Sequence, residues 1–125
     1  MSINGFPSRT NLGGTYAIPV RVLGTGAAVV TKVFGQGVTI TRDSAGLHTY
    51  TFSDPPGNFV GFTAGFQATT PVNMLNHELV LEPFVAHTAS ADAYIKGTVY
   101  DGSAIDDLEA LEWMNVTFFF RRESF

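Results

Sequence analysis

Short alternations of apolar and polar residues, broken by turn-forming residues, constrain the fold of this chain more than any other feature. Between Tyr16 and Phe120, stretches rich in Val, Ile, Thr and aromatic residues end at Gly, Pro or Asp about every ten residues. This spacing predicts roughly seven or eight strands. Because long helical stretches between them are missing, a parallel α/β fold is disfavoured. We therefore expect an all-β fold, either a single antiparallel β-sandwich or jelly-roll-like domain or a small β-barrel, with at most one short helix.

Residues 37–52, GVTITRDSAGLHTYTF, carry the clearest strand signal. Val38 and Ile40 alternate with threonines before the RDSAG segment, and His48 alternates with further threonines after it. Gly46 can adopt a positive φ, so the segment predicts a β-hairpin with a loop of four or five residues. We expect its threonine rows to face solvent or a neighbouring molecule, and His48 to lie on a sheet face or an interface.

The residues of the first and last predicted strands indicate where each strand lies in its sheet. Pro19 removes a backbone donor from the first strand, which is typical of an edge strand or a strand start. Gly61 and Gly65 indicate a bulge or a close backbone approach in the segment 58–70. The last strand is apolar on both faces, so it should be central in its sheet or covered by a neighbour. One of its faces comprises Met114, Val116, Phe118 and Phe120, and the other Trp113, Thr117 and Phe119.

The segment 103–114, SAIDDLEALEWM, is the one helical candidate. Ser103 could cap a helix, Asp106 and Asp107 suit its first turn, and Leu108 and Leu111 recur at helical spacing. We therefore expect a single short helix here.

The length of 125 residues suits one hydrophobic core, so we expect one β-domain over residues 15–125. Residues 1–14 have no periodicity and are interpreted as a flexible or partner-ordered arm. The opening MSINGFPSRTNLGG lacks the run of a secretory signal, and no stretch has the apolar length of a membrane span. With a net charge of −4 and no cysteine, neither nucleic acid, membranes nor disulfides are expected.

The shortage of charge points to assembly. Charged residues make up 14% of the chain, against about 25% in typical soluble domains, while hydrophobic residues make up 45%. Since monomers seldom expose large apolar patches, part of this surface is expected to be covered in an oligomer. The alternative is that Thr, Ser, Gly and Asn solvate the surface without charge.

Motifs for chemistry are weak in this sequence. The Gly-x-Gly at Gly24 lacks the strand and helix context of a nucleotide site, and the three histidines lack the spacing of metal ligands. His77 and His87 flank a predicted strand, and we expect both to be solvated. A carboxylate-rich loop can hold calcium, but the alternating ligand pattern is missing, and the acids also suit a helix N-terminus. These acids are Asp101, Asp106, Asp107, Glu109 and Glu112. No catalytic constellation is visible, so we expect no enzyme activity, no cofactor and no metal.

Three segments resemble small virion structural proteins of tailed bacteriophages, of the capsid decoration (cement) or head-fibre type. They are the hairpin 37–52, the strand and polar turn of residues 72–107, and the ending MNVTFFFRRESF. The resemblance covers about two thirds of the chain. It implies a compact β-domain that forms a homotrimer, is made in the host cytoplasm and sits on the capsid surface, where it binds the major capsid protein and reinforces the shell.

The interface is expected at the two ends of the chain. Rim contacts are expected from Arg9, Arg21 and Lys32. A glycan- or receptor-binding module of a phage fibre or tail is the alternative, and it would need an exposed row of Tyr or Trp. The candidate interface residues are Phe6, Arg9, Trp113, Phe118, Phe119, Phe120 and Phe125.

Overall fold

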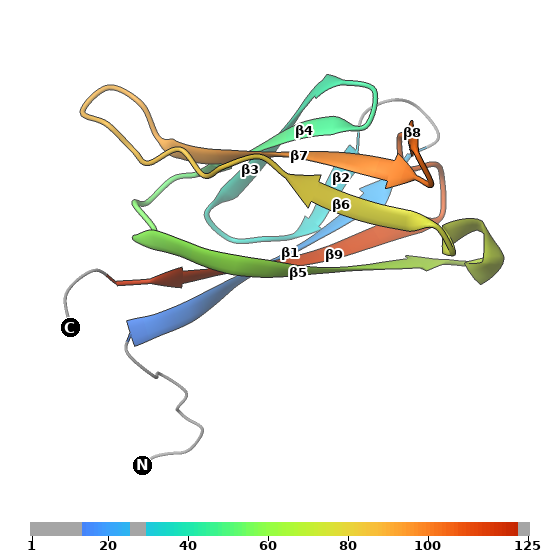
Figure 1. The fold of residues 1–125 in the computed structure, drawn as a ribbon, viewed down its shortest axis with the longest axis horizontal. Helices are drawn as coiled ribbons and strands as arrows, with labels where there is room; N and C mark the ends of the chain where they lie inside the picture. Colours follow the sequence, from blue (N-terminus) through green and yellow to red (C-terminus); the bar gives the residue numbers. More distant parts are fainter. Residues whose placement is uncertain (1–13, 26–29, 123–125) are drawn as a thin grey trace, which may run out of the picture.

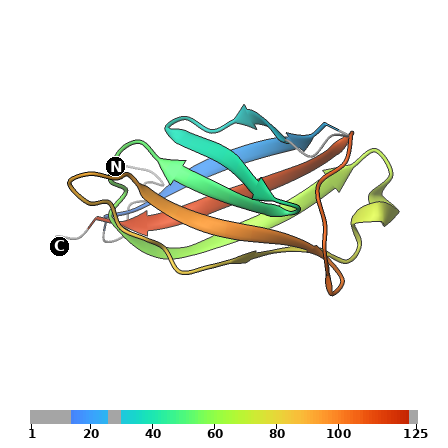
Figure 2. The same cartoon turned by 90° about the horizontal axis from the view of Figure 1, so that it is seen from above.

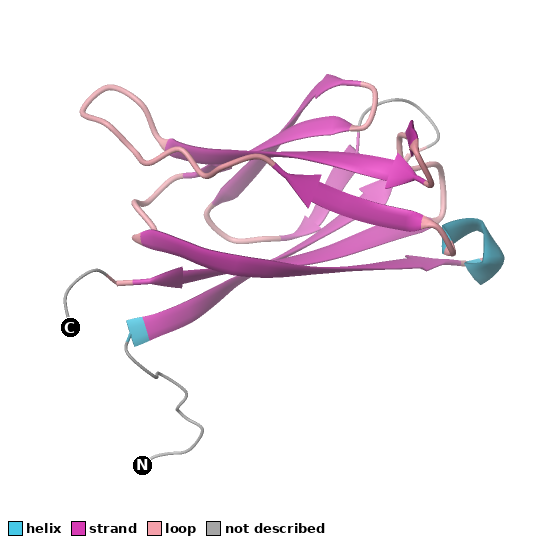
Figure 3. Ribbon diagram, viewed as in Figure 1, coloured by secondary structure: helices cyan, strands magenta, loops and turns pink. Residues whose placement is uncertain are grey.

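Two antiparallel sheets face each other in the computed structural model, which describes residues 14–25 and 30–122 (Figures 1 and 2). The elements are β1 (Thr15–Gly24), β2 (Val30–Phe34), β3 (Val38–Ser44), β4 (Leu47–Phe52), β5 (Asn58–Ala68), η2 (Pro71–Met74), β6 (His77–Leu81), β7 (Ala93–Asp101), β8 (Ala104–Ile105) and β9 (Glu112–Arg121). Sheet A has the order β2-β1-β9-β5, and sheet B the order β3-β4-β7-β6 with β8 paired to β7. The all-β, sandwich-like prediction is confirmed, and strands dominate the chain in Figure 3.

The core lies between the two sheets. Strand β9 alternates strictly, and its residues Met114, Val116, Phe118 and Phe120 are at most 1% exposed. They meet inward-facing residues of sheet B such as Tyr50. Because β9 lies between β1 and β5, the prediction of a central last strand is confirmed. Its backbone is hydrogen-bonded to a strand on each side, as expected for an apolar strand at the centre of a sheet.

The predicted hairpin forms, with a tighter turn than expected. Strands β3 and β4 extend to Ser44 and Leu47, so a two-residue turn replaces the expected loop of four or five residues. Gly46 has a φ of 69°, and a bulge between Arg42 and Ser44 absorbs the extra residue. The inward row of β4 begins with His48, which is 2% exposed and belongs to the interior instead of an interface.

Strand β1 tolerates Pro19 because β2 pairs with only the last part of the strand. It pairs with β9 from Thr15 to Leu23, but with β2 only from Arg21 to Gly24. In sheet order β1 lies between β2 and β9, so the prediction of an edge strand or a strand start is wrong for the strand as a whole. At Pro19 itself, however, β9 is the one neighbour among the described strands, so the missing donor is tolerated there. The bulge predicted in 58–70 is also present, between Phe59 and Gly61.

The predicted helix over 103–114 is wrong. Residues Ala104–Ile105 form β8, an irregular loop follows, and β9 begins at Glu112. A helix would bring Ile105, Leu108 and Leu111 to one face, but Leu108 alone is buried, at 1% exposed, while Leu111 is 54% exposed. Leu111 also has a φ of 63°. Tertiary contacts of Leu108 outweigh the weak helical preference of this short segment.

Tyr50 buries its hydroxyl without a hydrogen-bond partner in the described part of the chain. Replacing it with Phe should raise the free energy of unfolding by about 1 kcal/mol at neutral pH, because an unpaired buried polar group is costly. Burial also raises the pKa of this hydroxyl above 10.0. Above about pH 10 the unfolded chain ionises first, so wild-type stability should fall by up to about 1.4 kcal/mol per pH unit from this group.

Urea unfolding of both proteins between neutral pH and pH 11 measures this effect. The advantage of Tyr50→Phe should grow above about pH 10, because Phe has no proton to lose. A variant less stable than wild type at neutral pH would mean that the hydroxyl has a partner in solution.

Candidate functional site

The outward side of sheet A is a continuous surface built by β1, β9 and β5. Cross-strand partners share one face of a sheet, so the register places the partners of the half-buried residues Trp113, Asn115, Thr117 and Phe119 on this surface. We call it the outer face. It comprises Thr15, Ala17, Pro19, Arg21, Leu23, Asn58, Gly61, Thr63, Gly65, Gln67, Trp113, Asn115, Thr117, Phe119 and, at its end, the exposed Arg121.

The outer face is nearly free of charge. Its charged residues in the described chain are Arg21 at the centre and Arg121 at the end of β9. Glu112, the one acid in the strands of sheet A, faces inward. The remaining acids of the described chain lie on sheet B or in loops. The described part of the molecule is therefore acidic away from the outer face and free of acids on it.

A cross-strand network holds the centre of the outer face. The Arg21 Nη1 donates to Gln67 Oε1 and to Asn115 Oδ1, each at 2.8 Å. The guanidinium also lies 5.6 Å from the ring centroid of Trp113. These contacts tie the three strands together and hold the Arg21 guanidinium in a fixed position. The surface is therefore preorganised.

Glycines leave part of the outer face open on β5. Gly61 pairs with Phe119 and Gly65 with Asn115, and a Cβ added at either glycine would meet nothing within 4 Å. No side chain at these two positions of β5 therefore covers Phe119 or Asn115. A partner could reach Phe119 without displacing a side chain at either position.

Strand β5 is an edge strand without a charged residue. It spans 11 residues and pairs only with β9 among the described strands. The other edge strands carry charge, with Lys32 on β2, Arg42 and Asp43 on β3, and Glu78 on β6. Charged edge residues oppose pairing with another chain, so β5 is the edge on which such pairing is unopposed.

The predicted interface residues fall into three groups. Trp113 and Phe119 lie half-buried on the outer face, as a surface role requires. Phe118 and Phe120 are each 0% exposed in the core, so their assignment to an interface is wrong. The strand alternation puts them inward beside outward-facing Phe119. Three further candidates, Phe6, Arg9 and Phe125, lie outside the described residues.

The two described rim candidates have internal partners. Arg21 occupies the centre of the outer face instead of its rim. Lys32 donates to the carbonyl oxygens of Gly35 and Val38, at 2.9 and 2.6 Å, and so joins β2 to the start of β3.

A second candidate site lies at the end of the sandwich where β6 begins and β7 ends. A cavity of about 490 Å³ opens there, and we call it the acidic pocket. No lysine or arginine is among its described lining residues. These are Val72, Asn73, Asn76, His77, Asp101, Asp106, Glu109 and Glu112.

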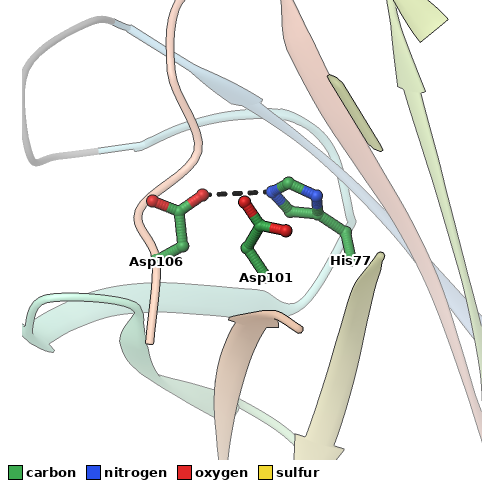
Figure 4. Close-up of side chains that lie close together, drawn as sticks. All are labelled: His77, Asp101 and Asp106. Carbon is green, nitrogen blue, oxygen red and sulfur yellow. Dashed lines mark hydrogen bonds and ion pairs between the residues drawn. The ribbon is translucent and has the colours of Figure 1, made fainter. Parts of the chain in front are cut away.

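His77, Asp101 and Asp106 converge at this pocket from three elements (Figure 4). The His77 Nε2 lies 3.1 Å from Asp106 Oδ2, and one ligand-type atom from each of the three residues lies within 4.8 Å of the others. The His77 side chain is only 2% exposed, so its predicted solvation is wrong. The Phe66 ring packs on the imidazole with centroids 5.6 Å apart and helps to hold it in place.

Asp107 points away from this group and is neutralised elsewhere. Its carboxylate accepts hydrogen bonds from Arg42 at 3.2 and 3.0 Å and from the Gly46 amide at 2.8 Å. The Arg42 hydrogen bond, together with the Gly46 amide and the guanidinium charge, holds the pKa of Asp107 below its usual value. The five acids predicted from sequence as one group are thus divided, because within the described residues Asp107 is the one that pairs with an arginine.

The sequence pattern could not reveal the acidic pocket. His77 and Asp101 are separated by the whole of β6, a long loop and β7, and they meet because these two strands pair with His77 opposite Asp101. Register between distant strands carries no local sequence signal. His87, by contrast, is exposed, as predicted.

Within the described residues, no helix has the length and apolar character needed to cross a lipid bilayer. Comparison of the chain with known protein families, with curated proteins and with solved structures found no match.

Proposed function

We propose that this chain is a non-enzymatic structural protein of a bacteriophage particle, a capsid decoration (cement) protein that associates with copies of itself and with the major capsid protein. The observation that carries the proposal is the acid-free outer face bordered by the edge strand β5, which has no charged residue. The resemblance of the hairpin and of the C-terminal strand to such proteins supplies the biological setting.

Self-association through sheet A follows from two properties of this surface. The outer face offers aromatic and small side chains, with Arg21 held by hydrogen bonds to Gln67 and Asn115 and Arg121 only at its end. The edge of β5 offers backbone donors and acceptors to a partner strand. A protein present in many copies turns such modest contacts into mechanical stability of a shell.

Replacing Thr63 with Lys should abolish self-association. Thr63 is exposed on β5, between the two open glycines, so a lysine there leaves the monomer fold intact and places an unpaired charge in the interface. Sedimentation equilibrium should give the wild type a mass near three times the 13.5 kDa of one chain, and the variant a monomer mass.

Thr39→Lys is the matched control, because Thr39 is equally exposed but lies on β3 of sheet B. It should keep the wild-type mass. A wild type that is monomeric at micromolar concentration, or equal effects of the two variants, would contradict the proposed interface.

Quantitative mass spectrometry of purified particles tests the capsid setting. A decoration protein should be present in a fixed, high ratio to the major capsid protein. A few copies per particle would favour a fibre or tail module, and absence from particles would contradict a virion role.

A further inference from the structure

We infer that the acidic pocket is a binding site for a divalent transition-metal ion, with His77, Asp101 and Asp106 as ligands. Zinc is the ion that we use as the probe. The site would join the start of β6, the end of β7 and the loop after β8. It lies apart from the outer face, and the inference does not depend on the proposed function.

The first argument is the geometry of the three side chains. Two ligand atoms on one metal ion, each about 2.1 Å from it, lie ~3.0 to 3.4 Å apart at octahedral or tetrahedral angles. The observed 3.1 Å between His77 Nε2 and Asp106 Oδ2 falls within this range. Asp101 is exposed and can close the remaining separation by a small rotation of its side chain.

The second argument is the state of His77. Its side chain is 2% exposed, and its Nε2 is directed at the two carboxylates while its Nδ1 is buried without a hydrogen-bond partner in the described chain. A buried imidazole normally has both nitrogens satisfied. Here Nε2 is the ring nitrogen that faces the pocket and would coordinate an ion, and the Phe66 ring packs against the imidazole in this orientation.

The third argument is uncompensated negative charge. Glu112 is 8% exposed and borders the same pocket, and the Glu109 amide is the one donor that reaches its carboxylate in the described chain, at 2.9 Å. The Asp101 carboxylate accepts no side-chain or backbone hydrogen bond there. Like charges that crowd around a cavity without a lysine or arginine repel one another, and a divalent cation removes this repulsion.

The donor set selects the class of ion. One imidazole nitrogen with carboxylate oxygens suits zinc or a similar first-row ion, whereas calcium and magnesium prefer oxygen ligands alone. Waters, or the carboxylate of Glu109, would complete the coordination. The ion would cross-link three segments of the chain and so stabilise this end of the sandwich.

Equilibrium dialysis of EDTA-stripped full-length chain against zinc, with metal quantified by mass spectrometry, tests the inference. We expect about one zinc per chain, a melting temperature that rises with zinc and returns with EDTA, and clearly weaker binding of calcium. Asp101→Asn should weaken zinc binding by roughly tenfold or more without lowering the melting temperature of the metal-free protein. His77→Gln should also lose zinc.

Two matched variants separate this site from adventitious binding. His87→Gln removes an exposed histidine outside the acidic pocket. Glu78→Gln removes an exposed acid from β6, the strand that carries His77. Both variants should bind zinc as the wild type does. Failure of the wild type to bind zinc at micromolar concentration would overturn the inference. So would zinc binding that survives Asp101→Asn, or calcium binding as tight as that of zinc.

Discussion

Phe120→Ala should lower the free energy of unfolding by about 3–5 kcal/mol, a large share of the ~5–15 kcal/mol that holds a domain of this size together. Phe120 is 0% exposed and lies at the centre of an aromatic cluster. Its ring is packed edge-on against Phe52, Phe59 and Phe84, with centroids 5.2, 5.6 and 5.3 Å away. Truncation removes these contacts and leaves a cavity that rigid strands on both sides cannot close.

Phe119→Ala is the matched control for this change. Phe119 is the preceding residue on the same strand, but it faces outward and is half-buried. Its loss should cost no more than about 1.5 kcal/mol in the monomer. Guanidinium unfolding at a concentration where the chain is monomeric measures both values, and equal losses would contradict the inward assignment of Phe120.

Gly24→Ala should be comparably destabilising, by about 3 kcal/mol or more. A Cβ at Gly24 would lie 2.1 Å from the carbonyl oxygen of Glu109 and 2.6 Å from the carbonyl carbon of Leu108. Both neighbours are backbone atoms, which cannot rotate away as a side chain would. The loop before β9 must therefore lift, and Leu108, which is 1% exposed, must leave the core.

Gly65→Ala on the same sheet provides the comparison. A Cβ at Gly65 would have nothing within 4 Å, so this variant should be neutral or up to about 1 kcal/mol more stable, since alanine restricts the unfolded chain. Thermal and chemical unfolding of the two variants distinguish the positions. A tolerated Gly24→Ala would mean that the loop does not lie against β1 in solution.

The alternation of residues along a strand predicted the direction of side chains correctly wherever the strand has one buried and one outward face. It correctly assigned Phe118 and Phe120 to one side of the last strand and Phe119 to the other, because successive side chains of a strand point in opposite directions. It did not say which side faces the core. For that reason, core and interface residues of this strand were combined in one interface prediction.

The segment before β9 shows where local reasoning fails. Its acids and its apolar spacing are typical of a short helix, yet the chain there forms an irregular loop. Gly24 and Gly46 leave room for this loop against β1 and the β3–β4 turn. These contacts come from residues about 60 or more positions away, and no local window contains them.

The sequence by itself determined the all-β class, the hairpin and the shortage of charge, because each depends on composition or on a period of two within one strand. Tertiary structure alone decided which face of sheet A is outward and which edge strand lacks charge. It also decided that His77 meets Asp101 and Asp106. These features depend on how distant strands pair and stack, and that choice is made by burial of the whole core.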